Sequence, residues 1–140
     1  MSFDERWKNL RVNFSTKEKL APAKETALRE IIHDLRGRAT AFRASSNYEA
    51  SIHAYMRLIP LEDQIYTPDS PEAATSFNNL GEALIKQGDM AAAEEGVSTA
   101  LRVREDVRFG GLGLGSRYDA SVSRENMAKI KEGTGILSEI

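Results

Sequence analysis

The sequence predicts an all-α protein built from antiparallel helix pairs that stack on one another. Ala, Leu, Glu, Lys and Arg, which favour helix, are abundant among its 140 residues, and alternating runs of β-branched residues are scarce. Apolar residues recur instead at steps of three and four, as on one stripe of an amphipathic helix. The pattern returns 42 residues later, which indicates a repeated helical unit.

The first long helix is predicted from about Pro22 to about Ala44. Ser15 and Glu18 have the spacing of a capping box ahead of it, and Pro22 suits the first turn, where its missing N–H costs nothing. The polar residues 45–47 end this helix. Its apolar stripe consists of Ala27, Leu28, Ile31, Ile32, Leu35, Ala39 and Phe42.

A second helix follows the turn and pairs with the first in antiparallel fashion. Pro60 is expected to kink or restart it, because proline removes a backbone hydrogen bond inside a helix. The apolar stripe ahead of that point consists of Tyr48, Ile52, Tyr55, Met56 and Leu58.

A second helix pair is predicted after the Pro-rich break TPDSPE at residues 67–72. Its turn lies at residues 87–89, where Gly88 can take a positive φ. The stripe before the turn consists of Phe77, Leu80, Gly81, Leu84 and Ile85, and the stripe after it of Ala92, Ala93, Val97, Ala100 and Leu101.

The two units align without gaps at an offset of 42 residues. Their turns and apolar stripes fall in the same register, and the paired side chains are of compatible size. A third, partial unit begins near Ala120, where residues 126–128 mirror residues 79–81 at an offset of 47. The register-locked pairs of the first two units are Ala39 with Gly81, Phe42 with Leu84, Tyr48 with Met90, Ser51 with Ala93, Tyr55 with Val97, and Leu58 with Ala100.

The stretch TSFNNLGEALIKQGDMAAAEEGVSTAL at residues 75–101 resembles a tetratricopeptide repeat. Small residues stand where the two helices touch, at Gly81 and Ala93, and Ala100 closes the unit. Large apolar residues, Leu80, Leu84 and Val97, fill the space between them. The 42-residue spacing, the NNL triplet and the lead-in PDSPEAATS are most similar to the kinesin light chain variety of this repeat.

The resemblance is specific over residues 67–104 and weaker over residues 35–66, where Arg38 replaces the usual Leu and Ser51 the usual Ala. It implies a right-handed α-α superhelix of helix–turn–helix repeats. The long N-terminal helix, with Trp7, Leu10 and Phe14 ahead of it, is expected to cap one end. We expect one domain: a cap segment at residues 1–21, repeats at 22–66 and 67–109, a Gly-rich loop at 110–116, and a partial third repeat at 117–140.

The resemblance also implies that first helices line a groove that binds a peptide or helix of a partner protein. Asn79 and Asn126, in the same register, are implied to bond the backbone of the bound peptide, since an amide offers both donor and acceptor. The alternative is that they bond neighbouring helices or water. The implied groove residues are His33, Arg36, Thr40, Arg43, Asn78, Asn79, Glu82, Asn126 and Lys129.

Two arginines suggest a preference for acidic ligands. Arg36 and Arg43 lie seven residues apart, on one helix face, and could hold carboxylates in bidentate fashion. The alternative is an exposed helix with internal pairs, such as Arg29 with His33 or Asp34 with Arg38.

Composition argues against other classes of protein. The charge of +4 on residues 1–44 and −6 on the remainder includes no Lys/Arg cluster dense enough to predict nucleic-acid binding. No apolar run is long enough for a membrane span, and no signal peptide is recognisable, so a cytoplasmic or nuclear location is expected. The sequence has no cysteine.

No enzymatic, metal or cofactor site is predicted. His33 and His53 lack the spacing of metal ligands, and no nucleophile elbow is present. The Gly-rich residues 110–115 match neither a dinucleotide-binding motif nor a phosphate-binding loop.

Two alternative functions stay open at this stage. The apolar residues Ile136, Leu137 and Ile140 could form an open C-terminal edge that joins two copies in a homodimer, because stacked repeats need neighbours to cover their ends. The chain could also be a sensor of a small ligand or signalling peptide, which would require a deep apolar pocket beneath the Gly-rich loop.

Overall fold

The computed structural model describes residues 20–66, 70–105 and 120–133. These ranges hold no β-strand, and the prediction of an all-α helical repeat is confirmed. Trp7, Leu10 and Phe14 ahead of the first long helix, the Gly-rich loop and the apolar C-terminal residues lie outside the described residues. The helices are α2 (Pro22–Ala44), α3 (Tyr48–Tyr66), α4 (Pro71–Gln87), α5 (Met90–Glu105) and α7 (Ser121–Gly133).

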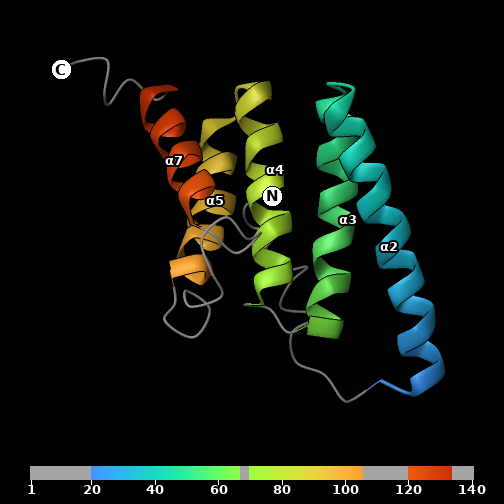
Figure 1. Ribbon diagram of the computed structural model, residues 1–140. Coiled ribbons are helices and arrows are strands. Elements are labelled where there is room, and N and C mark those ends of the chain that lie inside the picture. The colour runs from blue at the N-terminus through green and yellow to red at the C-terminus, as the bar shows by residue number, and fades with distance from the viewer. Residues whose placement is uncertain (1–19, 67–69, 106–119, 134–140) are drawn as a thin grey trace.

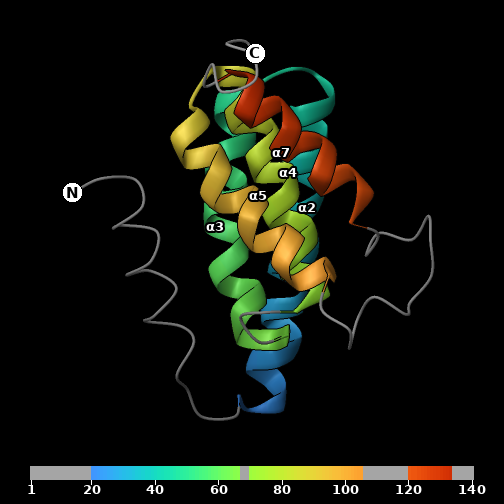
Figure 2. The same cartoon turned by 90° about the vertical axis from the view of Figure 1, so that its left-hand side faces the viewer.

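The helices form two successive antiparallel hairpins and a further helix (Figure 1). Helix α3 packs between α2 and α4, and α5 packs between α4 and α7. Figure 2 shows the same stack from the side, with α7 across α4 and α5. Helices α2, α4 and α7 therefore correspond to the predicted first helices, and α3 and α5 to the second helices.

Helix α2 begins at Pro22, in the first turn, as the sequence predicts. Its N-cap residue, Ala21, provides no side-chain hydrogen bond, and the predicted capping box at Ser15 and Glu18 lies outside the described residues. Helix α4 also has a proline, Pro71, in its first turn. Its N-cap residue is Ser70, whose hydroxyl accepts a hydrogen bond from the Ala73 N–H at 3.1 Å.

Helix α3 does not restart at Pro60. It continues from Tyr48 to Tyr66 with Pro60 inside it. Pro60 is buried beside Leu58 and Ile59, both 0% exposed. Burial of this apolar segment between α2 and α4 offsets the lost backbone hydrogen bond, an effect that the local pattern does not reveal.

The two interhelical turns are equivalent residue by residue at the predicted offset. Ser46 and Gly88 both have positive φ, 62° and 85°. The following residues, Asn47 and Asp89, cap the second helices by accepting hydrogen bonds from backbone N–H groups three residues later. Both turns also return backbone hydrogen bonds to the preceding helix at matching positions, from Asn47 to Phe42 and from Asp89 to Leu84.

Close contact between paired helices recurs at the small residues. The Ser51 hydroxyl donates to the carbonyl oxygen of Ala39 at 3.3 Å, so α3 reaches the backbone of α2. In the second hairpin, a Cβ at Gly81 would lie 3.4 Å from the carbonyl oxygen of Ala93 and would overlap the Val97 Cγ2 methyl.

Burial differs between the two first helices at one register position. Leu80 is 1% exposed, whereas its counterpart Arg38 is largely exposed and pairs with Asp34 at 2.9 Å. Helix α4 has described neighbours on both sides, and α2 has them on one. The repeat-packing residues that the sequence singled out, Ala39, Tyr55, Leu58, Leu80, Gly81, Leu84, Ala93, Val97 and Ala100, are buried, and Phe42 and Tyr48 are half-buried.

Gly81→Ala is expected to lower the free energy of unfolding by about 1–3 kcal/mol, because the added methyl overlaps Val97 in a packed crossing. Gly37→Ala is the matched control: nothing lies within 4 Å of a Cβ there, and alanine should stabilise the helix by about 0.5–1 kcal/mol. Urea unfolding followed by circular dichroism measures both. Equal effects would contradict the tight crossing at Gly81.

Ser46→Gly is expected to stabilise the protein by about 0.5 kcal/mol, since glycine relieves the left-handed conformation but costs more entropy on folding. Gly88→Ser should destabilise it by about 0.5–1 kcal/mol for the converse reason. Thermal unfolding of the two variants measures both effects. Shifts of the melting temperature in the same direction would contradict the equivalence of the turns.

Candidate functional site

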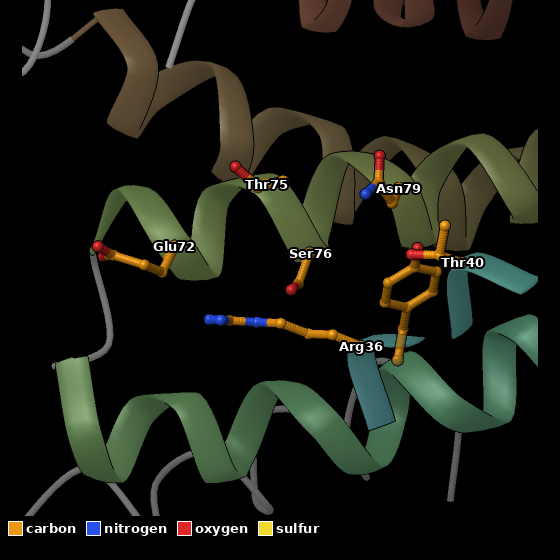
Figure 3. Close-up of a pocket in the computed structure, with 7 residues that line it drawn as sticks. Arg36, Thr40, Glu72, Thr75, Ser76 and Asn79 are labelled. Carbon is orange, nitrogen blue, oxygen red and sulfur yellow. The ribbon is translucent and has the colours of Figure 1, made fainter. Parts of the chain in front are cut away.

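A hollow of about 140 Å³ opens between the two first helices α2 and α4, with α3 beneath it (Figure 3). We call it the α2–α4 pocket. Three of the implied groove residues, Arg36, Thr40 and Asn79, line it together with residues that the sequence did not single out as ligand contacts. The complete lining is Arg36, Thr40, Tyr55, Glu72, Thr75, Ser76 and Asn79.

Arg36 is held by a buried carboxylate. Its Nε and Nη2 donate to Glu62 Oε2 at 3.1 and 2.6 Å, and Glu62 is 0% exposed. The guanidinium also lies over the Tyr66 ring, 5.5 Å from its centroid. Burial lowers the pKa of Arg36, but the hydrogen bond and the charge of Glu62 raise it overall. Figure 3 shows the side chain extending toward Glu72 and Ser76 on α4.

Burial raises the pKa of the Glu62 carboxyl, and the nearby Ser76 and Arg36 lower it only in part. Only one of the two carboxylate oxygens is engaged by Arg36, and Oε1 has no hydrogen-bond partner among the described residues. A buried charge with one unsatisfied oxygen costs free energy, so the proton is held more tightly here than in water.

The second groove arginine is also engaged within the protein. Arg43 Nη1 donates to Asn79 Oδ1 at 3.3 Å and lies 3.6 Å from Glu82 Oε2. Arg36 and Arg43 therefore both neutralise carboxylates of this chain. This arrangement does not provide the pair of unpaired arginines that bidentate binding of a ligand's carboxylates would require.

Tyr55 brings a polar group to the lining of the α2–α4 pocket. The residue is 2% exposed, and its hydroxyl has no hydrogen-bond partner in the described part of the chain. The Asn79 and Thr40 side chains lie near it but outside hydrogen-bond geometry. Burial raises the pKa of this phenol, and the nearby Arg43 lowers it only in part.

Two predicted groove asparagines lie elsewhere. Asn78 and Asn126 are 3% and 2% exposed, and the Asn126 Nδ2 donates to Asn78 Oδ1 at 3.1 Å. The Ser123 hydroxyl donates to the same oxygen at 2.8 Å and accepts from Arg104 Nη1 at 2.9 Å. Because α7 covers this face of α4, the two amides join helices, and their implied contact with a ligand does not fit the structure.

The remaining implied residues lie apart from the pocket lining. His33 and Lys129 are exposed on α2 and α7. Of the predicted intrahelical pairs, Arg38 with Asp34 is present at 2.9 Å. Arg29 instead pairs with Glu25 at 2.9 Å, one helical turn earlier, and its Nη1 donates to the Tyr66 hydroxyl.

The polar residues between repeats follow the same register as the apolar ones. Glu62 and Arg104 are 42 residues apart, and both are buried on second helices. Glu62 lies beside Ser76 of the next first helix, and Arg104 bonds Ser123 of the one after it. The sequence signal for these contacts was a charged residue at the same position of two otherwise apolar helix faces. The helical periodicity alone did not reveal it.

The described ranges contain no group of three or more His, Asp or Glu side chains arranged to hold a metal ion. Among the same residues, no helix combines the length and apolar character needed to cross a membrane.

A sequence model of the tetratricopeptide repeat family matches residues 32–106, more than half of the chain. The chain belongs to the tetratricopeptide repeat family. The match spans most of α2 and all of α3, α4 and α5, the helices that build the α2–α4 pocket. Comparisons with curated proteins and with solved structures found no match. Tetratricopeptide repeats are generally protein–protein interaction modules, which makes a protein the expected class of partner.

Glu62→Gln is expected to change how stability depends on pH. A raised pKa means that folded Glu62 keeps its proton at pH values where the unfolded chain has lost it. Its contribution to stability is therefore fully present below the ordinary value of 4.5 and declines as pH rises toward the higher folded value. Relative to Glu62→Gln, the wild-type protein should lose stability as pH rises above 4.5.

Urea unfolding at a series of pH values measures this difference, with Glu94→Gln on the exposed side of α5 as the control. The raised pKa would be contradicted if the free energy of unfolding of wild type, relative to Glu62→Gln, stayed constant or increased as the pH rises.

Proposed function

We propose that this tetratricopeptide repeat protein is a non-catalytic scaffold that binds a peptide or helix of a partner protein along α2, α4 and α7. The α2–α4 pocket carries the proposal, because polar side chains from three helices converge there on an open hollow. The side-chain oxygen of Asn79 accepts a hydrogen bond from Arg43, and the N–H₂ group of Asn79 makes no hydrogen bond within the described ranges. That group supports a contact with the backbone of a bound peptide.

The proposed contact residues are those of the implied groove that stay accessible. Thr40 is exposed beside the pocket, and His33 and Lys129 are exposed on α2 and α7. Arg36, Arg43 and Glu82 keep part of their side-chain surface exposed, although Arg36 pairs with Glu62 and Arg43 with Glu82. Each neutral hydrogen bond contributes about 0.5–1.5 kcal/mol net, so a short peptide should bind with a dissociation constant on the order of micromolar.

The 42-residue spacing and the NNL triplet support a repeat of the kinesin light chain type. We place the protein in the cytoplasm, acting as an adaptor. A protein partner is favoured over nucleic acid, because the arginines beside the pocket are already paired with Glu62 and Glu82.

Self-association is a second candidate function, which one observation favours. Val122 on α7 is 45% exposed, and Leu101 and Met127 line a shallow hollow on α5 and α7. A second copy that covers this surface would form a homodimer. Sedimentation equilibrium measures it: a dimer that Val122→Asp dissociates would support this role, and a monomer at all concentrations would remove it.

Selection of a displayed random-peptide library on the immobilised full chain tests the scaffold role. Asn79→Ala should weaken the selected peptides about fivefold or more, as expected for the loss of about 1 kcal/mol. Fluorescence polarisation with labelled peptides measures the dissociation constants.

Two controls separate binding from folding. Glu94→Ala, on the exposed side of α5, should leave the affinity unchanged. Asn126→Ala should keep the affinity but lower the free energy of unfolding by about 1–3 kcal/mol, since it removes a buried hydrogen bond to Asn78. Failure to select any peptide, or peptides that bind Asn79→Ala as well as wild type, would overturn the proposed function.

A further inference from the structure

The α2–α4 pocket is small, and every residue that lines it has a polar side chain. Its volume of about 140 Å³ is close to that of a cavity that holds one benzene-sized group, so it accommodates the end of a single side chain. Hydroxyls from Thr40, Thr75, Ser76 and Tyr55 and the amide of Asn79 line it. An apolar group placed among them would separate these groups from water without replacing their hydrogen bonds.

The charges around the pocket oppose a charged ligand of either sign. Arg36 pairs with Glu62 and Arg43 with Glu82, so a ligand carboxylate would have to compete with these two carboxylates for the arginines. Glu72 also lines the pocket, and the Arg36 guanidinium extends toward it, so a cationic group would have to compete with Arg36 for acidic partners (Figure 3). A neutral group avoids both penalties.

Hydrogen-bonding groups of both kinds border the hollow. The Asn79 N–H₂ and the Nη1 of Arg36 are donors that make no hydrogen bond with the described residues. The buried Tyr55 hydroxyl, likewise unpartnered, can donate or accept. A carboxamide matches this set, because its carbonyl oxygen can accept from the two donors and its N–H₂ group can donate to the Tyr55 hydroxyl.

We infer that the α2–α4 pocket receives the neutral carboxamide side chain of an Asn or Gln residue of the bound peptide, with the Tyr55 hydroxyl as its specificity contact. The inference rests on the proposed peptide-binding function and names the side chain that this site selects. The carbonyl oxygen of the amide accepts from Asn79 or Arg36, and its N–H₂ donates to Tyr55.

The first experiment uses small probes and does not need a peptide. Propionamide, propionate and propylammonium are titrated into ¹⁵N-labelled full-length protein, and the NMR signals of Thr40, Ser76 and the Asn79 side chain are followed. Propionamide should give saturable shifts, with the two charged probes at least about fivefold weaker, because each leaves a buried polar group unsatisfied or a charge opposed.

Tyr55→Phe should weaken propionamide about fivefold to tenfold, as expected for one lost hydrogen bond. Tyr48→Phe, which removes a hydroxyl that donates to Ser46 at the turn and does not line the pocket, should leave binding unchanged. The free Tyr55→Phe protein should be as stable as wild type or more so, since it loses a buried hydroxyl without a partner. This combination distinguishes a recognition role of Tyr55 from a structural one.

The peptide selection described above provides the second readout. Selected peptides that share Asn or Gln at one position, with that preference lost on Tyr55→Phe, would support the inference. Peptides that carry Asp, Glu, Lys or an aromatic residue there would overturn it and leave the scaffold function standing. Propionamide binding without any selected peptide would support the pocket chemistry and overturn the scaffold function, and binding of neither would overturn both.

Discussion

The close crossing of each helix pair is the constraint on which the rest of this structure depends. At Ala39 and at Gly81 the first helix approaches the second so closely that only a methyl group or a hydrogen fits. The close approach determines which side chains pack at the crossing. Val97 packs against Gly81 in the second hairpin, and its counterpart in the first hairpin is the buried Tyr55. The pocket between α2 and α4 thus owes its buried hydroxyl to one aromatic substitution within a repeated scaffold.

The features that depend on local pattern were predictable from the sequence. The offset of 42 residues anticipated which turns and crossings would match, and Ser46 takes the same left-handed conformation as Gly88 although serine rarely does. Features that depend on tertiary burial were not predictable in this way. Pro60 interrupts a helix in isolation, yet the helix continues because its apolar neighbours are buried.

The candidate site shows the same division. Arg36, Thr40 and Asn79 lie on one pocket as the register of first helices implied. Asn78 and Asn126 do not, because α7 packs on α4 and buries the two amides against each other, and the spacing of residues within one helix carries no information about that contact. Glu62 was overlooked since a carboxylate in an amphipathic pattern normally marks the solvent face, whereas here it holds Arg36 from inside.

The polar groups at positions 62 and 104 have opposite charges in the two hairpins. Glu62 pairs with Arg36 within its own hairpin. Asn78 is the counterpart of Arg36 in the second hairpin, and Ser123 links it to Arg104 by hydrogen bonds. Exchanging α3 for α5 would bring two guanidinium groups into contact and leave an asparagine opposite a buried carboxylate without a cation. Each second helix is thereby matched to its own first helix, so this array could be rearranged by moving whole hairpins but not by recombining single helices.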